Sequence, residues 1–163
     1  CLLMARAINM SEEEKRKLYR ACLLHDIGFL RIRVKDVTSK KEYMAHPNFA
    51  ADMLRPINFY ADITPIILHH HERFDGAGYP AGLRGEFIPL EARMIAIAEA
   101  FDAMMSRDSY KYIGKFIDGS SKPSYFEFRS AIEELRRNAG TQFDPELVDV
   151  FVNNINEDFL EET

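Results

Sequence analysis

The chain has 163 residues and a formal net charge of −5; 47% of the residues are hydrophobic and 29% are charged. This composition excludes a disordered tail and fits one globular domain, residues 1–163, around a single sizeable core. An acidic chain without a cluster of Lys and Arg is a poor candidate for duplex nucleic acid, since phosphate neutralisation dominates that affinity. No apolar run approaches the length needed to cross a bilayer, so we expect no membrane span within this chain. Its two cysteines, Cys1 and Cys22, are too few for a disulfide framework and predict reduced thiols in a cytoplasmic protein.

Helix caps and hydrophobic spacing predict a helix near the start of the chain and another before residue 46. Ser11 and Glu14 predict a capping box at the start of an amphipathic helix, and Gly28 is expected to end that helix near residue 27. An irregular segment follows. Ser39 and Glu42 predict the cap of the next helix, which runs toward residue 46.

Two prolines predict where the next helices begin. Pro47 suits the first turn of a helix that ends before Pro56. Thr64 and Pro65 form a predicted cap and first turn of a further helix, which carries His70.

Two long loops interrupt the helices in the second half. Residues 73–89 contain four glycines and two prolines, which predict a long ordered loop, and loops of this length in compact domains are more often functional than not. Residues 90–106 predict a strong helix, and 112–123 form a second irregular stretch. The caps of the last two helices are predicted at Ser124 with Glu127, and at Asp144–Pro145. The predicted fold class is therefore an all-α helical bundle.

Four histidines and two carboxylates form an ordered series of candidate metal ligands on four predicted helices that must pack together. They are His25, Asp26, His46, His70, His71 and Glu99. A single His-Asp pair is far more often structural, and adjacent histidines are commonly a solvated helix surface, but the whole series favours a metal site. A mixed nitrogen and oxygen ligand set suits iron, manganese or zinc better than calcium.

Several motifs resemble those of the HD-GYP branch of the HD metal-dependent phosphohydrolases. The stretch His70–Pro80 resembles the signature HHExxDGxGYP without a departure. Leu24–Gly28 resembles the HD motif and His46–Pro47 the next motif. Residues 92–98 resemble the helix that carries the last metal carboxylate, and Phe143–Pro145 resembles the start of the closing helix. The resemblance covers nearly the whole chain.

This resemblance implies an all-α HD-domain bundle with a long ordered GYP loop, as the C-terminal part of a longer chain. It implies hydrolysis of cyclic-di-GMP or a related nucleotide in bacterial signal transduction, with two divalent ions, iron or manganese first. Protein partners that bind through the GYP loop and a homodimer are further expectations. The alternative is a degenerate HD-GYP domain that serves as a signalling or protein-interaction module. The loop disfavours a third reading, an HD-type nucleotidase.

The resemblance also implies a role for each matching residue. Asp26 would bridge the two metals, and His25 would join one of them, so these two residues form the predicted catalytic pair. His46, His70 and His71 would complete the other metal. A hydroxide that bridges the metals would then attack phosphorus, since such a pair lowers the pKa of water.

The chain departs from the family pattern where phosphate is bound. Phe29 replaces a lysine and Asp108 replaces an arginine, and a lost charge-assisted contact typically costs about 1.5–3 kcal/mol. Lys111 keeps a cation and Arg107 is a candidate substitute. The segment 112–123, which looks like an insertion, is predicted either to pack beside the substrate entrance or to be a surface excursion.

Two further positions complete the prediction. Glu99 stands where the family has an aspartate ligand, and Asp102, one turn on, is the alternative. A further metal histidine of the family would fall upstream of Cys1. In the 73–89 loop, Gly78 and Tyr79 are the predicted substrate-binding residues, with Tyr79 near the mouth of the metal site.

Overall fold

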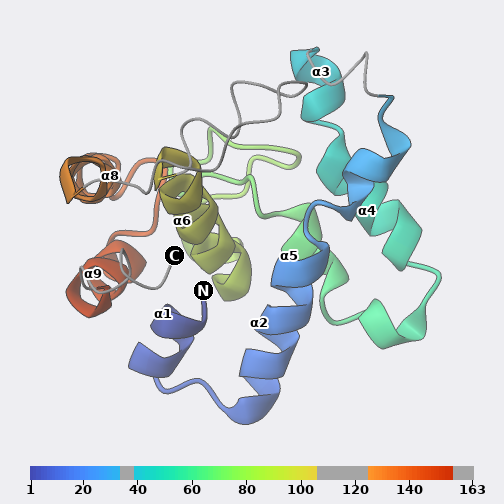
Figure 1. Cartoon of the computed structure of the whole chain (residues 1–163). Coiled ribbons are helices and arrows are strands. Elements are labelled where there is room, and N and C mark those ends of the chain that lie inside the picture. The colour runs from blue at the N-terminus through green and yellow to red at the C-terminus, as the bar shows by residue number, and fades with distance from the viewer. Residues whose placement is uncertain (34–38, 106–124, 156–163) are drawn as a thin grey trace.

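The computed structural model describes residues 1–33, 39–105 and 125–155, and Figure 1 shows them as a bundle of short helices. The α-helices are α1 (Leu2–Ala7), α2 (Glu12–Leu24), α3 (Lys40–Tyr43), α4 (His46–Leu54), α5 (Thr64–Leu68), α6 (Leu90–Met105), α8 (Tyr125–Arg137) and α9 (Pro145–Asn154). Three 3-10 helices join them: η1 (Ile27–Arg31), η3 (Asn58–Tyr60) and η4 (Gly85–Phe87). These ranges contain one isolated bridge pair and no strand, so the predicted all-α class is confirmed.

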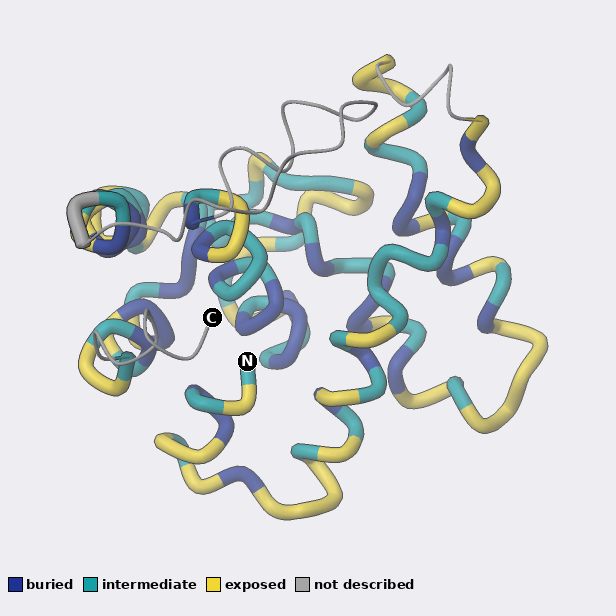
Figure 2. Tube along the Cα trace, in the orientation of Figure 1, coloured by how far each residue is buried: buried dark blue, intermediate teal, exposed yellow. Residues whose placement is uncertain are grey.

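Helix α6 is the central element of the bundle. It contacts α8 and α9 on one side and α2 and α5 on the other (Figure 1). Its side chains Met94, Ile97 and Phe101 are buried, and the Phe101 ring meets the ring of Phe151 in α9 edge to face at 5.1 Å. Figure 2 shows the buried segments gathered around this helix. The helix predicted over 90–106 is confirmed, with its end at Met105.

The first cap is confirmed, but the helix that it opens ends early. Ser11 Oγ accepts a hydrogen bond from the Glu14 amide at 3.2 Å, and Glu14 Oε2 accepts one from the Ser11 amide at 2.7 Å. The helix ends at Leu24 instead of near residue 27, and the chain turns into η1. Gly28 is therefore not a helix stop. A Cβ at Gly28 would lie 2.0 Å from the His46 carbonyl oxygen, so this glycine allows η1 to touch α4.

One predicted cap lies where expected without its side-chain bond, and another is wrong. Ser39 is the N-cap residue of α3, as predicted, but its side chain makes no cap bond, and α3 ends at Tyr43 before α4 begins. The Thr64 hydroxyl donates to the Tyr60 carbonyl at 2.8 Å, so Ile63 is the N-cap of α5. Neither helix start is held by a side-chain cap bond.

Both prolines lie in first turns, as predicted, and α4 ends before Pro56. Helix α5, however, ends at Leu68, so His70 follows it in a turn and is not carried on it. The Ser124 cap and the 112–123 segment lie outside the described residues.

The last cap is confirmed and has a second function. Asp144 Oδ1 accepts hydrogen bonds from the amides of Glu146 at 3.0 Å and Leu147 at 3.3 Å. Its Oδ2 pairs with Arg93 of α6, whose Nε donates to the Ile88 carbonyl at 3.1 Å. One buried carboxylate thus joins α9, α6 and the end of the long loop.

The 73–89 loop is ordered, as predicted, and contains η4. The turn between α8 and α9 holds its first part, because the Phe74 amide donates to the Gln142 carbonyl at 3.1 Å and the Asp75 amide to the Thr141 carbonyl at 2.8 Å. The Gly85 amide returns to the Phe74 carbonyl at 3.0 Å. Two segments far apart in sequence therefore lie side by side.

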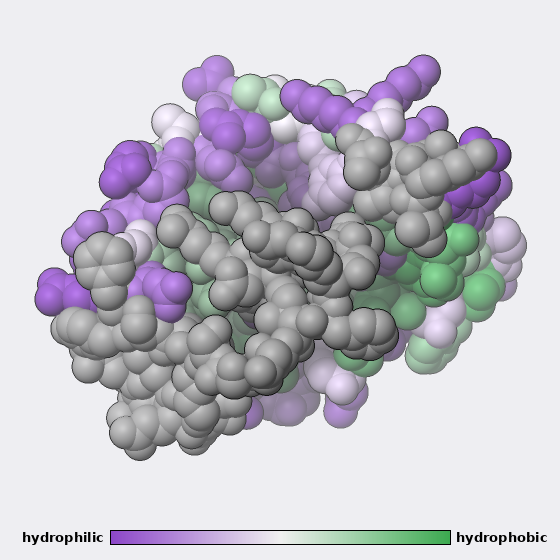
Figure 3. Space-filling view, turned by 45° about the horizontal axis from the view of Figure 1, so that its top comes forward, coloured by the Kyte–Doolittle hydropathy of each residue, from purple (hydrophilic) through white to green (hydrophobic). Residues whose placement is uncertain are grey.

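Hydrophilic side chains lie along the top of the view in Figure 3, and a hydrophobic area lies at its right. Within the described residues, no helix combines the length and the apolar character needed to cross a membrane.

Candidate metal centre

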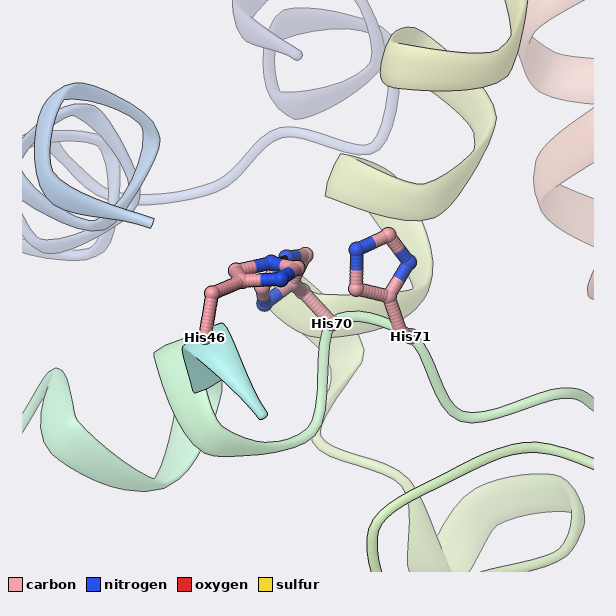
Figure 4. A group of neighbouring side chains, drawn as sticks. All are labelled: His46, His70 and His71. Atoms are coloured by element: carbon pink, nitrogen blue, oxygen red, sulfur yellow. Dashed lines mark hydrogen bonds between the residues drawn. The ribbon is translucent and has the colours of Figure 1, made fainter. Parts of the chain in front are cut away.

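Three histidines converge at the centre of the molecule. One ligand atom from each of His46, His70 and His71 lies within 4.8 Å of the others (Figure 4). His46 is the first residue of α4, and the other two form the turn after α5. The contact between η1 and α4 brings His25 and Asp26 to the same place, with the His25 and His70 rings 5.2 Å apart.

The same type of hydrogen bond fixes the tautomer of His25, His46 and His70. In each, Nδ1 faces the carbonyl oxygen of the residue three positions earlier. The pairs are His25 with Cys22 (2.7 Å), His46 with Tyr43 (2.6 Å) and His70 with Ile67 (2.6 Å). A carbonyl oxygen only accepts, so each Nδ1 must donate, and each neutral ring presents a bare Nε2 lone pair. Metal-binding histidines have this arrangement, with the second nitrogen donating to a backbone or carboxylate oxygen.

Burial keeps the clustered rings neutral. It lowers the pKa of His46, lowers that of His70 well below its ordinary value with help from the neighbouring His71, and lowers the pKa of His71 to about 3. The Nε2 atoms of His46 and His70 lie 3.2 Å apart. Since both are acceptors, they cannot hydrogen-bond to each other, and a cation between or beside them would satisfy both lone pairs.

The Asp26 carboxylate spans two of the histidines. Its Oδ1 lies 3.4 Å from His46 Nε2 and its Oδ2 lies 3.4 Å from His25 Nε2. Asp26 Oδ1 and His71 Nε2 are both buried without a hydrogen-bond partner. A carboxylate with one oxygen toward each of two imidazoles has the geometry of a bridging ligand. The donor set therefore fits divalent ions that accept nitrogen and oxygen ligands.

Glu99 of α6 lies at the edge of the cluster. Its Oε1 is 3.9 Å from His71 Nε2. Burial raises the pKa of Glu99 to about 7; His25 opposes this rise, while Asp26 and Asp102 add to it. Asp102 is exposed on the next turn, so Glu99 is the acidic residue of α6 that the structure brings to the histidines.

Aromatic rings cover the imidazoles. The Phe29 ring stacks on His46 with centroids 4.1 Å apart and an interplanar angle of 16°. Tyr79 stacks on His71 at 5.0 Å and 24°, and Tyr43 meets His46 edge to face at 5.3 Å. Burial raises the pKa of Tyr79 further above its ordinary value, so its phenol stays protonated. Sequence reasoning did not single out Tyr43, and nothing in its local pattern distinguishes it.

The predicted substrate-binding residues divide into two groups. Lys111 and Arg107 lie outside the described residues. Gly78 packs against the backbone before it, because a Cβ there would lie 2.3 Å from the Arg73 nitrogen, and a substrate contact of Gly78 stays a prediction.

A cavity of about 150 Å³ opens beside the histidines, and its lining includes His71, Arg73, Glu99 and Gln142.

Comparison with known proteins places the chain in a family. The model of the family described as HD domain matches residues 1–147. The chain is 35% identical to the cyclic di-GMP phosphodiesterase response regulator RpfG of Xanthomonas campestris, covering 92% of this chain and 39% of that protein. It is 32% identical to a 3'3'-cGAMP-specific phosphodiesterase 3 of Vibrio cholerae, covering 67% of this chain and 25% of that protein. The chain thus spans less than half the length of either relative.

A solved structure has the same fold. The crystal structure of a cyclic GMP-AMP specific phosphodiesterase of Vibrio cholerae, V-cGAP3, superposes with a TM-score of 0.67 over 98% of this chain and 45% of that chain, at 20% identity. With the family match over most of its length, the chain belongs to the HD domain family.

Proposed function

We propose that this domain is a metal-dependent phosphodiesterase of the HD-GYP type that hydrolyses a cyclic dinucleotide. One observation carries the proposal. Asp26 places one carboxylate oxygen toward His25 and the other toward His46, and the imidazole tautomers leave bare nitrogens toward the same space. The relatives named as cyclic di-GMP and 3'3'-cGAMP phosphodiesterases support the substrate class.

The ligands would divide between two divalent ions, for which iron and manganese are the first candidates. His25 would serve one ion; His46, His70 and His71 would serve the other, with Asp26 between them and Glu99 as a further carboxylate. Bound ions would supply positive charge for the phosphate oxygens and lower the pKa of water near the site. The side chains themselves need donate no nucleophile.

The protein's own residues would set the conditions for this chemistry. Neutral, buried imidazoles remain available as ligands near neutral pH. The exposed side of Asp26, whose side chain is 44% exposed, leaves room for a phosphodiester to approach. Lys111 and Arg107 would meet the substrate phosphates, and Tyr79 and Gly78 would border its path.

Phe29 supports the second candidate, a degenerate module with weak activity. Its apolar ring lies on His46, where the family has a phosphate-binding lysine, and it offers no charge to phosphate. We therefore expect slower hydrolysis than in relatives that keep the full set of cations. In this second candidate the loop would serve protein partners, and a cytoplasmic location in signal transduction and a homodimer are parts of the same proposal.

The decisive experiment measures metal and turnover together in the full-length protein. Metal content is determined by mass spectrometry, and cyclic-di-GMP and 3'3'-cGAMP are assayed with iron, manganese and zinc. Asp26→Asn and His70→Ala should lose metal and turnover. A wild type that binds metal but hydrolyses neither nucleotide supports the degenerate module, and one that binds no metal overturns the metal-dependent phosphodiesterase.

A further inference from the structure

We propose that Glu72 is a positioning residue that acts on His71 through the long loop. Its carboxylate holds the part of the loop that carries Tyr79, and the Tyr79 ring then fixes the orientation of the His71 imidazole. The inference rests on the proposed function, since it concerns a histidine of the candidate metal centre.

The Glu72 side chain is fully buried, and both of its carboxylate oxygens accept hydrogen bonds. The exposed fraction of the side chain is 0%. Oε1 accepts a hydrogen bond from the Ala81 amide at 2.7 Å, and Oε2 accepts one from the Leu83 amide at 3.1 Å. His69 Nδ1 lies 3.4 Å from Oε1. Burial of a carboxylate is costly unless it is bonded in this way, so the loop backbone is the partner that stabilises it.

These bonds fold the loop back onto the histidine turn. The Tyr79 amide donates to the His71 carbonyl at 3.2 Å. Gly78 packs on the backbone of Glu72, where a Cβ would lie 2.5 Å from the Glu72 Cα. Residues 78–83 are therefore fixed against residues 71 and 72 at several successive points.

The ring contact carries this placement to the metal centre. Tyr79 stacks on His71 with an interplanar angle of 24°, and His71 Nε2 is buried without a hydrogen-bond partner, 3.9 Å from Glu99 Oε1. Within residues 1–33, 39–105 and 125–155, no backbone carbonyl accepts a hydrogen bond from the His71 ring, in contrast to the Nδ1 bond that fixes His70. The direction of the Nε2 lone pair follows the ring plane, so the stacked Tyr79 sets where that lone pair points.

The other contacts of the loop separate this role from general stability. Phe74 and Asp75 bond to the turn between α8 and α9, so they hold the first part of the loop without Glu72. Loss of the Glu72 bonds should therefore release the Tyr79 part of the loop while the fold persists.

The test compares isosteric variants by cobalt binding and by proteolysis. Glu72→Gln keeps the shape but places an amide NH2 against one backbone N–H. The matched control is Glu91→Gln, which alters another buried carboxylate, bonded to Lys17 at 2.8 Å between α2 and α6. The cobalt(II) absorption bands report the ligand field at the histidines, and they respond to ring orientation but not to a general loss of stability.

We expect Glu72→Gln to shift the cobalt bands and to weaken cobalt affinity about tenfold or more, as loss of an outer-shell partner of a metal ligand typically does. Trypsin cleavage after the exposed Arg84 should increase at least tenfold in the metal-free variant. Glu91→Gln should change neither reading. In a Tyr79→Leu background, adding Glu72→Gln should produce no further shift of the bands, because the path through Tyr79 is already broken.

Three results would overturn the proposal: a wild-type cobalt spectrum in Glu72→Gln, unchanged trypsin cleavage, or a full additional effect in the Tyr79→Leu background. A wild type that binds no cobalt would instead remove the proposed metal site and the positioning role with it. The trypsin reading in the metal-free protein identifies that case, since it tests the hold on the loop without any metal.

Discussion

His46 and His70 face each other with their Nε2 atoms 3.2 Å apart, and each donates its Nδ1 hydrogen to a backbone carbonyl. Two acceptors at this distance repel unless a cation or a proton joins them. Burial lowers the pKa of both rings, which disfavours the proton. The pair therefore stores an unfavourable contact that a bound metal would relieve.

Metal should accordingly stabilise the protein. At a free concentration of manganese or zinc near 100 times its dissociation constant, we expect about 2.7 kcal/mol of added stability. For a domain of this size that corresponds to a rise in Tm of about 5–10 °C. Differential scanning fluorimetry checks this, with calcium as the control, because calcium prefers all-oxygen sites. His70→Ala should remove the shift, and an equal shift with calcium would count against a histidine site.

Acid should destabilise the metal-free protein. Burial lowers the pKa of His71 to about 3 and lowers those of His46 and His70, whereas an unfolded histidine titrates near about 6.5. Between these pKa values the unfolded chain binds more protons than the folded chain. The free energy of unfolding should therefore be highest above about pH 6.5 and decrease toward pH 3, by about 1.4 kcal/mol per pH unit for each ring that stays neutral.

Glu99 opposes this trend in part. Burial raises its pKa to about 7, while an unfolded glutamate titrates near about 4.3, so between these values the folded chain binds its proton more tightly. One carboxyl group offsets one of three histidines, and the net effect of acid stays unfavourable. Urea unfolding in EDTA at pH 7.5, 6 and 5 measures the slope, which should be steeper in Glu99→Gln. A constant unfolding free energy across this range would contradict the assignment of buried neutral histidines.

Restoring the missing cations should increase turnover. We expect Phe29→Lys combined with Asp108→Arg to increase kcat/KM for cyclic-di-GMP about tenfold or more, since each charge-assisted contact to phosphate is worth about 1.5–3 kcal/mol. Phe29→Leu is the control, because it removes the ring from His46 without adding charge. If the wild type already turns over quickly and the double variant does not differ, another residue such as Arg107 supplies the cation.

Gly28→Ala should damage the fold and the site together. The added Cβ would lie 2.0 Å from the His46 carbonyl oxygen, so η1 and α4 must separate, and with them Asp26 and His46. We expect the free energy of unfolding to decrease by about 3 kcal/mol, as for a severe overpacking change. We also expect metal binding to be lost. Gly140→Ala is the matched control: its φ is +78° with open space around it, so it should cost about 1–2 kcal/mol and leave metal binding intact. Chemical unfolding and metal titration separate the two, and retained metal binding in Gly28→Ala would contradict the argument.

The sequence predicts what depends on local chemistry. The Ser11 capping box and the Asp144 cap form as expected, because a side chain three or fewer residues away satisfies the orphan amides of a helix start. The histidine series also converges as expected, since its members lie at ends of short elements that meet at one place.

The features that the sequence does not predict depend on contacts between distant segments. The N-cap of α5 is Ile63 and not Thr64, and Ser39 occupies the N-cap position of α3 without making the expected side-chain bond. Gly28 is predicted to stop a helix, yet the reason that a glycine is needed there is the close approach of the His46 carbonyl, 18 residues later in the sequence. Likewise, the substitution of Phe29 can be read as a lost charge, but its stacking on His46 is visible only once η1 and α4 are side by side.

The candidate ligands differ greatly in their access to water. The Asp26 side chain is 44% exposed and that of His25 is 23% exposed, whereas His46 and His70 are fully buried. An ion that approaches past the carboxylate must therefore shed its water before it reaches the two inner imidazoles. Exchange of the inner ion should thus be slow even where affinity is modest, so the ion retained in a cell would reflect which metal was present when the domain folded as much as which metal binds best.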